Sequence, residues 1–155
     1  VMNKEKYNIF VISSDFNNDI VENLFLGVNK CFKDKSFSGN ITRVNVPGAF
    51  ELPYMAKQIV ESKNENIDCI ITLGCVIKGE TAHFEYISNA CTQSLANLTL
   101  QSNVPIMFGV ITAYNKEQAI KRSGTDFEEE TNYNIGYNVA SAAIKTIISK
   151  EKNNL

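Results

Sequence analysis

Apolar residues along this chain alternate between short unbroken runs and runs in which they recur every three or four positions. Unbroken runs predict strands buried on both faces, and the wider spacing predicts helices with one apolar face. Strands are predicted at residues 7–13, 41–46, 67–73 and 104–111, and helices at residues 21–32, 52–59, 84–98, 115–121 and 139–147. This alternation predicts an α/β fold, a three-layer αβα sandwich around a four-stranded parallel sheet.

The length and composition fit one domain. The chain has 155 residues, of which 44% are hydrophobic and 21% charged, as in ordinary globular proteins. A chain of this length buries about 68–70% of its unfolded surface, which is enough for a core. Because we find neither an internal repeat nor a composition shift, we expect residues 1–155 to form a single domain, frayed at residues 1–6 and 150–155.

Charge and cysteine content exclude several classes of function. A net charge of −2 argues against a nucleic-acid-binding or anionic-membrane-binding surface. No apolar run approaches the roughly 20 residues of a membrane span. The cysteines form no C-x-x-C pair and have no neighbouring histidine, which argues against a zinc or redox site; they are Cys31, Cys69, Cys75 and Cys91. We therefore expect no metal, no nucleic acid and no membrane.

The same cysteines bear on location. Unpaired, buried thiols are typical of a reducing compartment, and no basic-then-apolar leader opens the chain. We therefore expect a cytoplasmic protein. Val1 precedes Met2, so a targeting segment upstream of these residues stays an open alternative.

Residues 74–86 combine an apolar strand, a glycine turn and the only histidine, His83. They read Gly-Cys-Val-Ile-Lys-Gly-Glu-Thr-Ala-His-Phe-Glu-Tyr. A turn that opens a helix directs backbone N–H groups and the positive end of the helix dipole at a ligand, which suits a phosphate. Histidine is the residue type that exchanges protons near neutral pH. The segment therefore predicts an anion site beside a proton donor, with an ordinary βα connection as the alternative.

Other candidate residues follow the ends of the other predicted strands, where ligands bind in open parallel sheets. Phe16 and Phe108 can stack on a planar heterocycle, and Glu51 can accept hydrogen bonds from sugar-alcohol hydroxyls. Lys78 and Arg122, with the turn amides, can hold a phosphate. Structural alternatives stay open, since the phenylalanines suit a core and Arg122 suits a helix C-terminus. First-turn acids such as Glu51 and Glu80 likewise suit a helix dipole.

Three blocks of the sequence resemble the lumazine synthase family. They are Val-Pro-Gly-Ala-Phe-Glu-Leu-Pro at residues 46–53, the histidine segment at residues 74–86, and Pro-Ile-Met-Phe-Gly-Val-Ile-Thr at residues 105–112 with Glu-Gln-Ala-Ile-Lys-Arg-Ser-Gly-Thr at residues 117–125. The resemblance implies the penultimate step of riboflavin biosynthesis. In that step 5-amino-6-(D-ribitylamino)uracil and 3,4-dihydroxy-2-butanone 4-phosphate condense to 6,7-dimethyl-8-ribityllumazine, phosphate and water.

The resemblance also implies a role for each site residue. His83 is expected to donate protons, and Glu80, Thr81 and Arg122 to bind the butanone phosphate, supported by Lys78 and Gly79. The residues expected to contact the ribitylaminouracil are Phe16, Ala49, Phe50, Glu51, Cys75, Val76, Ile77 and Phe108. No cofactor is expected. The partners implied are small-molecule substrates and further copies of the chain.

One segment departs from the family pattern. Many relatives carry a short Gly/Lys-rich turn after the third block, whereas residues 126–135 here are longer and acidic, with no Lys or Arg between Arg122 and Lys145. In those relatives the lysine of the turn also faces the phosphate. Its absence here is expected to weaken phosphate binding by about 1.5–3 kcal/mol unless another cation compensates. Because shells in this family go with a short turn here, we expect a homopentamer rather than an icosahedral shell.

Two other functions stay open on the sequence alone. The acidic segment allows a catalytically weak or inactive family member that acts as a ribityl-pteridine-binding, flavin-binding or scaffold protein. The predicted arrangement is flavodoxin-like, which also allows a nucleotide binder. That alternative is weaker, because the first strand–helix turn, residues 13–17, has neither a glycine fingerprint nor a phosphate-binding Gly-Lys-Ser.

Overall fold

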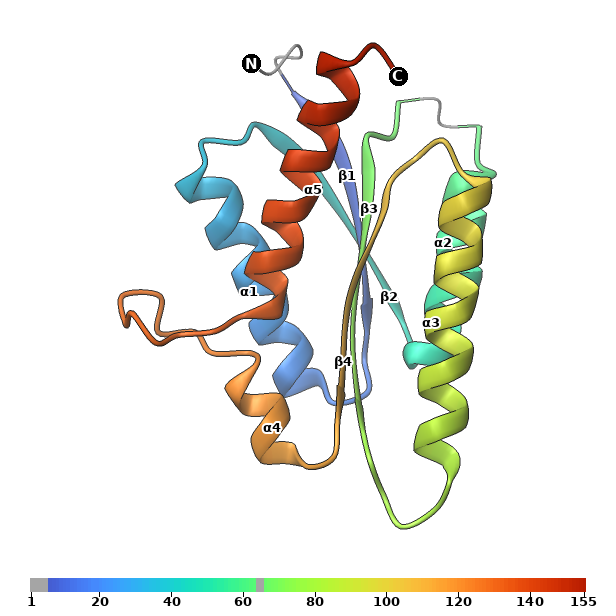
Figure 1. Cartoon of the computed structure of the whole chain (residues 1–155), viewed down its shortest axis with the longest axis vertical. Coiled ribbons are helices and arrows are strands. Elements are labelled where there is room, and N and C mark those ends of the chain that lie inside the picture. The colour runs from blue at the N-terminus through green and yellow to red at the C-terminus, as the bar shows by residue number, and fades with distance from the viewer. Residues whose placement is uncertain (1–5, 64–65) are drawn as a thin grey trace.

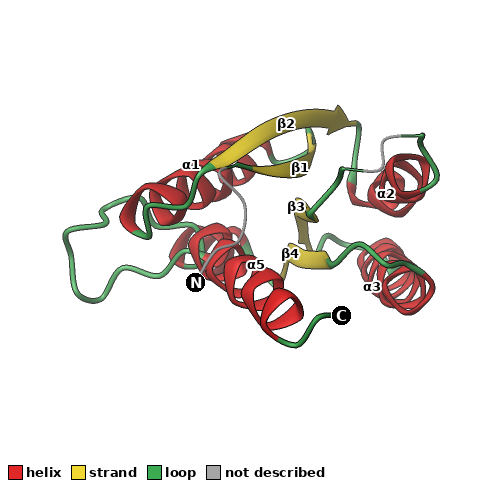
Figure 2. Ribbon diagram, turned by 90° about the horizontal axis from the view of Figure 1, so that it is seen from above, coloured by secondary structure: helices red, strands yellow, loops and turns green. Residues whose placement is uncertain are grey.

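The computed structural model describes residues 6–63 and 66–155 and confirms the predicted three-layer arrangement (Figures 1 and 2). Its four strands are all parallel, in the order β2-β1-β3-β4. The strands are β1 (Tyr7–Ser14), β2 (Gly39–Val46), β3 (Cys69–Ile77) and β4 (Ile106–Ala113). The helices are α1 (Asn18–Asp34), α2 (Leu52–Val60), α3 (His83–Gln101), α4 (Lys116–Lys121) and α5 (Ile135–Lys152), with a 3₁₀ turn at Ala49–Glu51.

Each face of the sheet has its own apolar core. On one face α1 and α5 pack on the strands through residues such as Leu24 and Ile144. On the other face α2 and α3 cover the sheet through residues such as Leu52 and Leu95. The central strand β3 is buried through Cys75, as its unbroken apolar run predicts. The helix face predicted near the C-terminus is confirmed, with its apolar residues buried: Val139, Ala140, Ala143, Ile144 and Ile147.

Two strands run further than their patterns predict. The expectation that the third strand ends at residue 73 is wrong, because β3 continues to Ile77 and pairs with β4 up to Ala113. Gly74 serves close packing instead: a Cβ atom there would lie 3.1 Å from Leu52 Cδ1 and 3.2 Å from Ser14 Oγ. The turn into α3 falls at residues 78–82. Consequently Cys75, Val76 and Ile77 lie on the strand rather than after it.

The strand β4 is likewise displaced from its prediction. It spans Ile106–Ala113, so the expectation that Phe108 follows its end is wrong. Phe108 is the third residue of β4 and pairs with Thr72, near the middle of β3. The side chain therefore lies away from the carboxyl ends of the strands.

The helices α1 and α5 approach closely because glycines lie between them. A Cβ atom at Gly136 would lie 1.9 Å from the Leu24 carbonyl oxygen, and one at Gly27 would lie 2.0 Å from Asn134 Oδ1. At its other end α5 continues to Lys152, and the Leu155 N–H donates to the Lys150 carbonyl oxygen at 3.0 Å. We predict fraying at residues 1–6, of which residues 1–5 lie outside the described residues. Within the described part of the chain, no helix is both long enough and apolar enough to cross a membrane.

Candidate active site

A pocket of about 610 Å³ lies at the carboxyl ends of β2 and β3, on the face covered by α2 and α3. It draws its walls from the β1–α1 connection, the β2–α2 connection and the segment that leads from β3 into α3. The residues that line it are Phe16, Pro47, Gly48, Ala49, Phe50, Glu51, Cys75, Val76, Ile77, Gly79, Thr81, His83, Phe84 and Ile87. Ten of the predicted site residues are therefore brought together in one chain.

Phe16 forms the wall that comes from the β1–α1 connection. Phe16 is 71% exposed, so the core alternative for this residue is wrong. The backbone N–H of Phe16 donates to the Pro47 carbonyl oxygen at 3.0 Å, which joins this wall to the next. Asn17 follows in the left-handed conformation, with φ 56°, and its Nδ2 donates to the Cys75 carbonyl oxygen at 2.9 Å. Asn17 caps α1 by position but uses its side chain to hold Phe16 against β3.

The second wall is the turn before α2, and Glu51 shapes it. The Glu51 Oε2 atom accepts a hydrogen bond from the Gly48 N–H at 2.9 Å, which closes the 3₁₀ turn. Within the turn Ala49 is buried, whereas Phe50 is 59% exposed and so is not a core residue either. Glu51 also stands at the start of α2, as the helix-dipole alternative requires. The two roles are compatible, because a carboxylate offers two acceptor oxygens.

His83 begins α3 and forms the third wall with Thr81. Its side chain is exposed, and its backbone N–H donates to Thr81 Oγ1 at 3.3 Å. Lys78 does not line the pocket: its backbone N–H donates to the Ala113 carbonyl oxygen, and its Nζ lies 5.8 Å from the centre of the Tyr114 ring. Glu80 is exposed and also lies outside the lining. The imidazole thus stands at the mouth of the pocket, next to the turn that closes β3.

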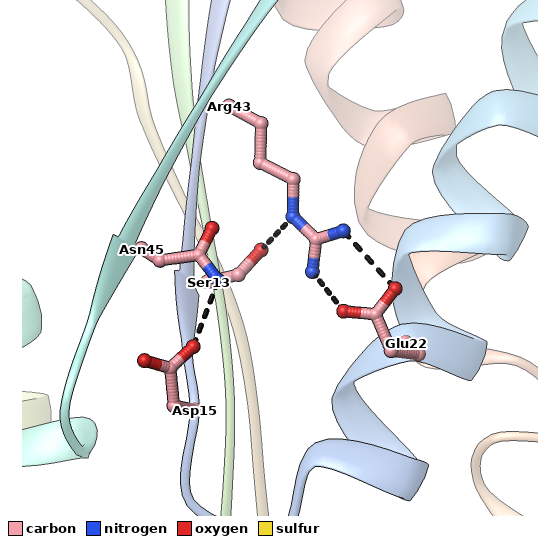
Figure 3. Close-up of polar contacts among 5 residues, drawn as sticks. All are labelled: Ser13, Asp15, Glu22, Arg43 and Asn45. Atoms are coloured by element: carbon pink, nitrogen blue, oxygen red, sulfur yellow. Dashed lines mark hydrogen bonds and ion pairs between the residues drawn. The ribbon is translucent and has the colours of Figure 1, made fainter.

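A polar network holds the Phe16 wall to the sheet (Figure 3). Arg43 of β2 makes a two-pronged ion pair with Glu22 of α1 and donates from Nε to Ser13 Oγ at 3.1 Å. The guanidinium group keeps the pKa of the Glu22 carboxyl below its ordinary value of 4.5. Asn45 Nδ2 donates to Asp15 Oδ1 at 2.7 Å, one residue before Phe16. The network therefore fixes the strand ends from which two pocket walls emerge.

Besides Lys78 and Glu80, two further predicted site residues lie outside the pocket of their own chain. Phe108 is 43% exposed and lines a separate groove of about 190 Å³ between α3 and β4. Arg122 follows α4, whose Ala119 is buried in the core on the opposite face of the sheet, beside α1 and α5. The Arg122 Nη1 atom donates to the Gln118 carbonyl oxygen at 3.1 Å, and the side chain is exposed. A single chain therefore does not bring these two groups to the histidine.

Comparison with known proteins identifies the family. A family model described as 6,7-dimethyl-8-ribityllumazine synthase matches residues 6–151. The chain belongs to the lumazine synthase family. Lumazine synthases of this name are 38% identical in Flavobacterium psychrophilum, over all of this chain and 79% of the relative, and 36% identical in Flavobacterium johnsoniae, over 94% of this chain and 73% of the relative. A lumazine synthase from Campylobacter jejuni is 42% identical over 76% of this chain and 75% of its own.

Four residues that line this lumazine synthase pocket were not among the predicted site residues. Pro47 and Gly48 belong to the first family block, residues 46–53, so their turn chemistry was a usable signal. Phe84 and Ile87 fall on the apolar stripe of α3 that was predicted to face the core. Both are only partly buried, because the first turn of α3 extends past the end of the sheet and faces the cavity. No periodicity signal separates such residues from core residues.

Burial makes the cysteines unreactive. It raises the pKa of Cys69 and Cys75 to about 12 and that of Cys91 to about 11, and it also raises the pKa of Cys31. Cys75 lines the lumazine synthase pocket, but a thiol with such a pKa stays protonated at neutral pH and is a poor nucleophile. Among residues 6–63 and 66–155, no group of three or more His, Cys, Asp or Glu side chains has the arrangement of a metal site.

Proposed function

We propose that this chain is an active lumazine synthase, condensing 5-amino-6-(D-ribitylamino)uracil with 3,4-dihydroxy-2-butanone 4-phosphate. The observation that carries the proposal is the single pocket that joins the exposed Phe16 ring, the Glu51 carboxylate and the His83 imidazole at one rim of the sheet. A volume of about 610 Å³ lies in the range of pockets for small-molecule substrates. We also propose that the enzyme works in the cytoplasm, because its four thiols are unpaired.

The pocket walls suit different parts of the pyrimidine substrate. The exposed face of Phe16 offers a stacking partner for the flat ring. Glu51 is the acceptor for ribityl hydroxyls, since its second carboxylate oxygen is available beyond the bond to Gly48. Ala49, Phe50 and the strand residues Cys75, Val76 and Ile77 complete this half of the cavity. Thr81 and Gly79, near His83, form the part assigned to the phosphate substrate, with Glu80 and Lys78 beside it.

The reaction needs orientation and proton transfer. The 5-amino group of the uracil attacks the ketone and, with loss of water, gives an imine; phosphate then leaves by elimination. The ribitylamino nitrogen attacks the remaining carbonyl carbon, and loss of a second water closes the second ring. Holding two substrates in reacting geometry makes a bimolecular step effectively unimolecular. His83 transfers protons in these steps, a role that typically contributes ~10²–10⁴-fold.

Phe108 and Arg122 are assigned to the pocket of a neighbouring subunit in a homopentamer. Two features support this assignment: both residues belong to a family block, and both lie outside the pocket of their own chain. Arg122 then supplies the charge that holds the phosphate group. Light scattering is expected to give the mass of five chains. A particle of megadalton mass would instead indicate a closed shell.

The deciding experiment mixes the purified protein with both substrates and follows the fluorescence of the lumazine product. Turnover is expected with no added metal or organic cofactor. Binding of a ribityl-pteridine or flavin without product formation would instead indicate a binding or scaffold protein. For the assigned roles, Arg122→Ala is expected to raise KM for the butanone phosphate more than KM for the uracil. Lys121→Ala is the matched control, because Lys121 is adjacent, exposed and paired with Glu117.

A further inference from the structure

Asn134 is a buried polar residue outside the pocket whose side chain joins three segments of the chain. It is 3% exposed and stands directly before α5. Its Nδ2 atom donates to the carbonyl oxygens of Asn23 in α1 and Gly124, both at 2.9 Å. Its Oδ1 atom accepts from the Tyr137 N–H at 3.0 Å, which caps α5. All of the donor capacity of the amide is therefore used.

The backbone around Asn134 is tied to Arg122. The Ile135 N–H donates to the Arg122 carbonyl oxygen at 2.9 Å, and the Gly124 N–H donates to the Tyr133 carbonyl oxygen at 3.0 Å. Between these bonds Ser123 and Asn134 form an isolated antiparallel bridge. The Asn134 amide adds a bond to Gly124 from the side chain. These bonds join residues 122–124 to residues 133–135 at the start of α5, and we call them the ladder. The long acidic connection, residues 125–132, begins and ends at the ladder.

Helix α1 supplies the fixed support for this ladder. The amide reaches the Asn23 carbonyl oxygen only because Gly27, one turn along α1, has no side chain; a Cβ atom there would lie 2.0 Å from Asn134 Oδ1. Gly136, two residues beyond Asn134, lets α5 approach α1 equally closely. Glycine in a helix interior is less stable than alanine by about 1 kcal/mol. The close approach of α1 and α5 therefore requires residues that destabilise the helices locally.

We propose that Asn134 is a positioning residue for Arg122, and that its clamp to α1 makes the placement of Arg122 independent of the acidic connection at residues 125–132. This inference rests on the proposed role of Arg122 in binding phosphate. Asn134 touches no substrate; it fixes the backbone from which the guanidinium group projects. On this proposal the length of the connection has no effect on the position of Arg122. The connection contains no lysine, so it supplies no phosphate contact itself.

The test separates the clamp from the helix cap with two variants. Asn134→Ser keeps a neutral cap acceptor for α5 but cannot reach the Asn23 and Gly124 carbonyl groups, whereas Asn134→Ala loses both functions. Both variants are expected to raise KM for the butanone phosphate and the inhibition constant of inorganic phosphate about fivefold, with kcat and KM for the uracil within about twofold. Only Asn134→Ala is expected to lose the cap contribution to thermal stability.

Val139→Ala is the matched control, because it removes buried volume from α5 without touching the ladder. It is expected to lower the melting temperature and leave KM for the butanone phosphate unchanged. A second arm inserts Gly-Ser-Gly between Glu129 and Glu130, which lengthens the connection without altering its charge. That insertion is expected to leave KM for the butanone phosphate within about twofold of the parent value.

Two results would overturn the inference: a parental KM for the butanone phosphate in Asn134→Ser, or a severalfold rise in the insertion variant. If Asn134→Ala does not fold, these two variants decide the question alone. Arg122→Ala, measured alongside, distinguishes failure of the phosphate-binding role of Arg122 from failure of the positioning role of Asn134. An unchanged KM for the butanone phosphate in Arg122→Ala refutes the assigned phosphate role, whereas a raised KM there with a parental Asn134→Ser refutes only the positioning role.

Discussion

Replacement of Glu51 tests how the pocket recognises the pyrimidine substrate. The carboxylate has one oxygen bound to the Gly48 N–H at 2.9 Å and a second oxygen assigned to the ribityl hydroxyls. Glu51→Gln keeps an oxygen for Gly48 but loses the charge, which is expected to raise KM for the uracil by roughly 5–10-fold. Glu51→Ala loses both bonds. A hydrogen bond to an ionised group contributes about 1.5–3 kcal/mol, so the expected rise is roughly 10–150-fold.

The assay is steady-state formation of the fluorescent lumazine, with each substrate varied at a saturating level of the other. KM for the butanone phosphate is expected to stay within about twofold in both variants, because Glu51 faces the ribityl half of the pocket. Glu51→Ala is also expected to lower kcat, since the 3₁₀ turn that presents Phe50 loses its closing bond. Equal increases in KM for the two substrates, or a Glu51→Gln variant as impaired as Glu51→Ala, would refute the assignment.

Three further predictions address the chemistry, the packing and the polar network. His83→Ala is expected to lower kcat by about 10²-fold, because imine formation and phosphate loss proceed without it; an unchanged kcat in the lumazine assay would remove His83 from the catalytic residues. Gly136→Ala places a Cβ atom 1.9 Å from a carbonyl oxygen of α1 and is expected to cost about 3 kcal/mol or more in urea unfolding, whereas a Cβ atom at Gly79 meets nothing within 4 Å and Gly79→Ala is expected to cost far less. The lowered pKa of Glu22 means that its ion pair contributes stability above pH 4.5, which is lost as the pH falls through the pKa of the folded state. Arg43→Met is therefore expected to flatten the loss of stability as the pH falls below 4.5, and an unaltered acid unfolding curve contradicts this role.

Helices and strands that depend on local periodicity were predicted correctly from the sequence. The prediction was wrong where contacts between residues distant in the sequence set the end of a strand. The third strand was predicted to end at residue 73, yet β3 continues to Ile77, and Gly74 lies inside it, where it makes room for Leu52 and Ser14. These partners are contributed by other elements, so no local pattern contains them. Phe108 was misplaced for a different reason: the strand predicted at residues 104–111 already contains it, and its pairing with Thr72 places it within β4 rather than after the end of the strand.

Within the candidate site, residues in the sequence blocks were predicted and residues that hold the blocks together were not. Glu51 and His83 belong to contiguous motifs and line the pocket as expected. Asn17 stands at the N-terminal cap position of α1, but its side chain bonds to Cys75, 58 positions away in the sequence. For Asn134, the only feature visible in the sequence is its position before a predicted helix, which does not indicate the contacts that its side chain makes. Contacts of this kind depend on the packed arrangement of the layers, which periodicity alone does not determine.

The burial of every cysteine has a practical consequence for studying subunit exchange. With Cys69 and Cys75 at a pKa of about 12 and Cys91 at about 11, maleimide reagents at neutral pH find almost no native thiolate. A cysteine introduced on the surface, for example at Asn153 beyond α5, would carry a single fluorophore without prior removal of the native thiols. Donor- and acceptor-labelled batches could then report by energy transfer how fast assembled subunits trade places.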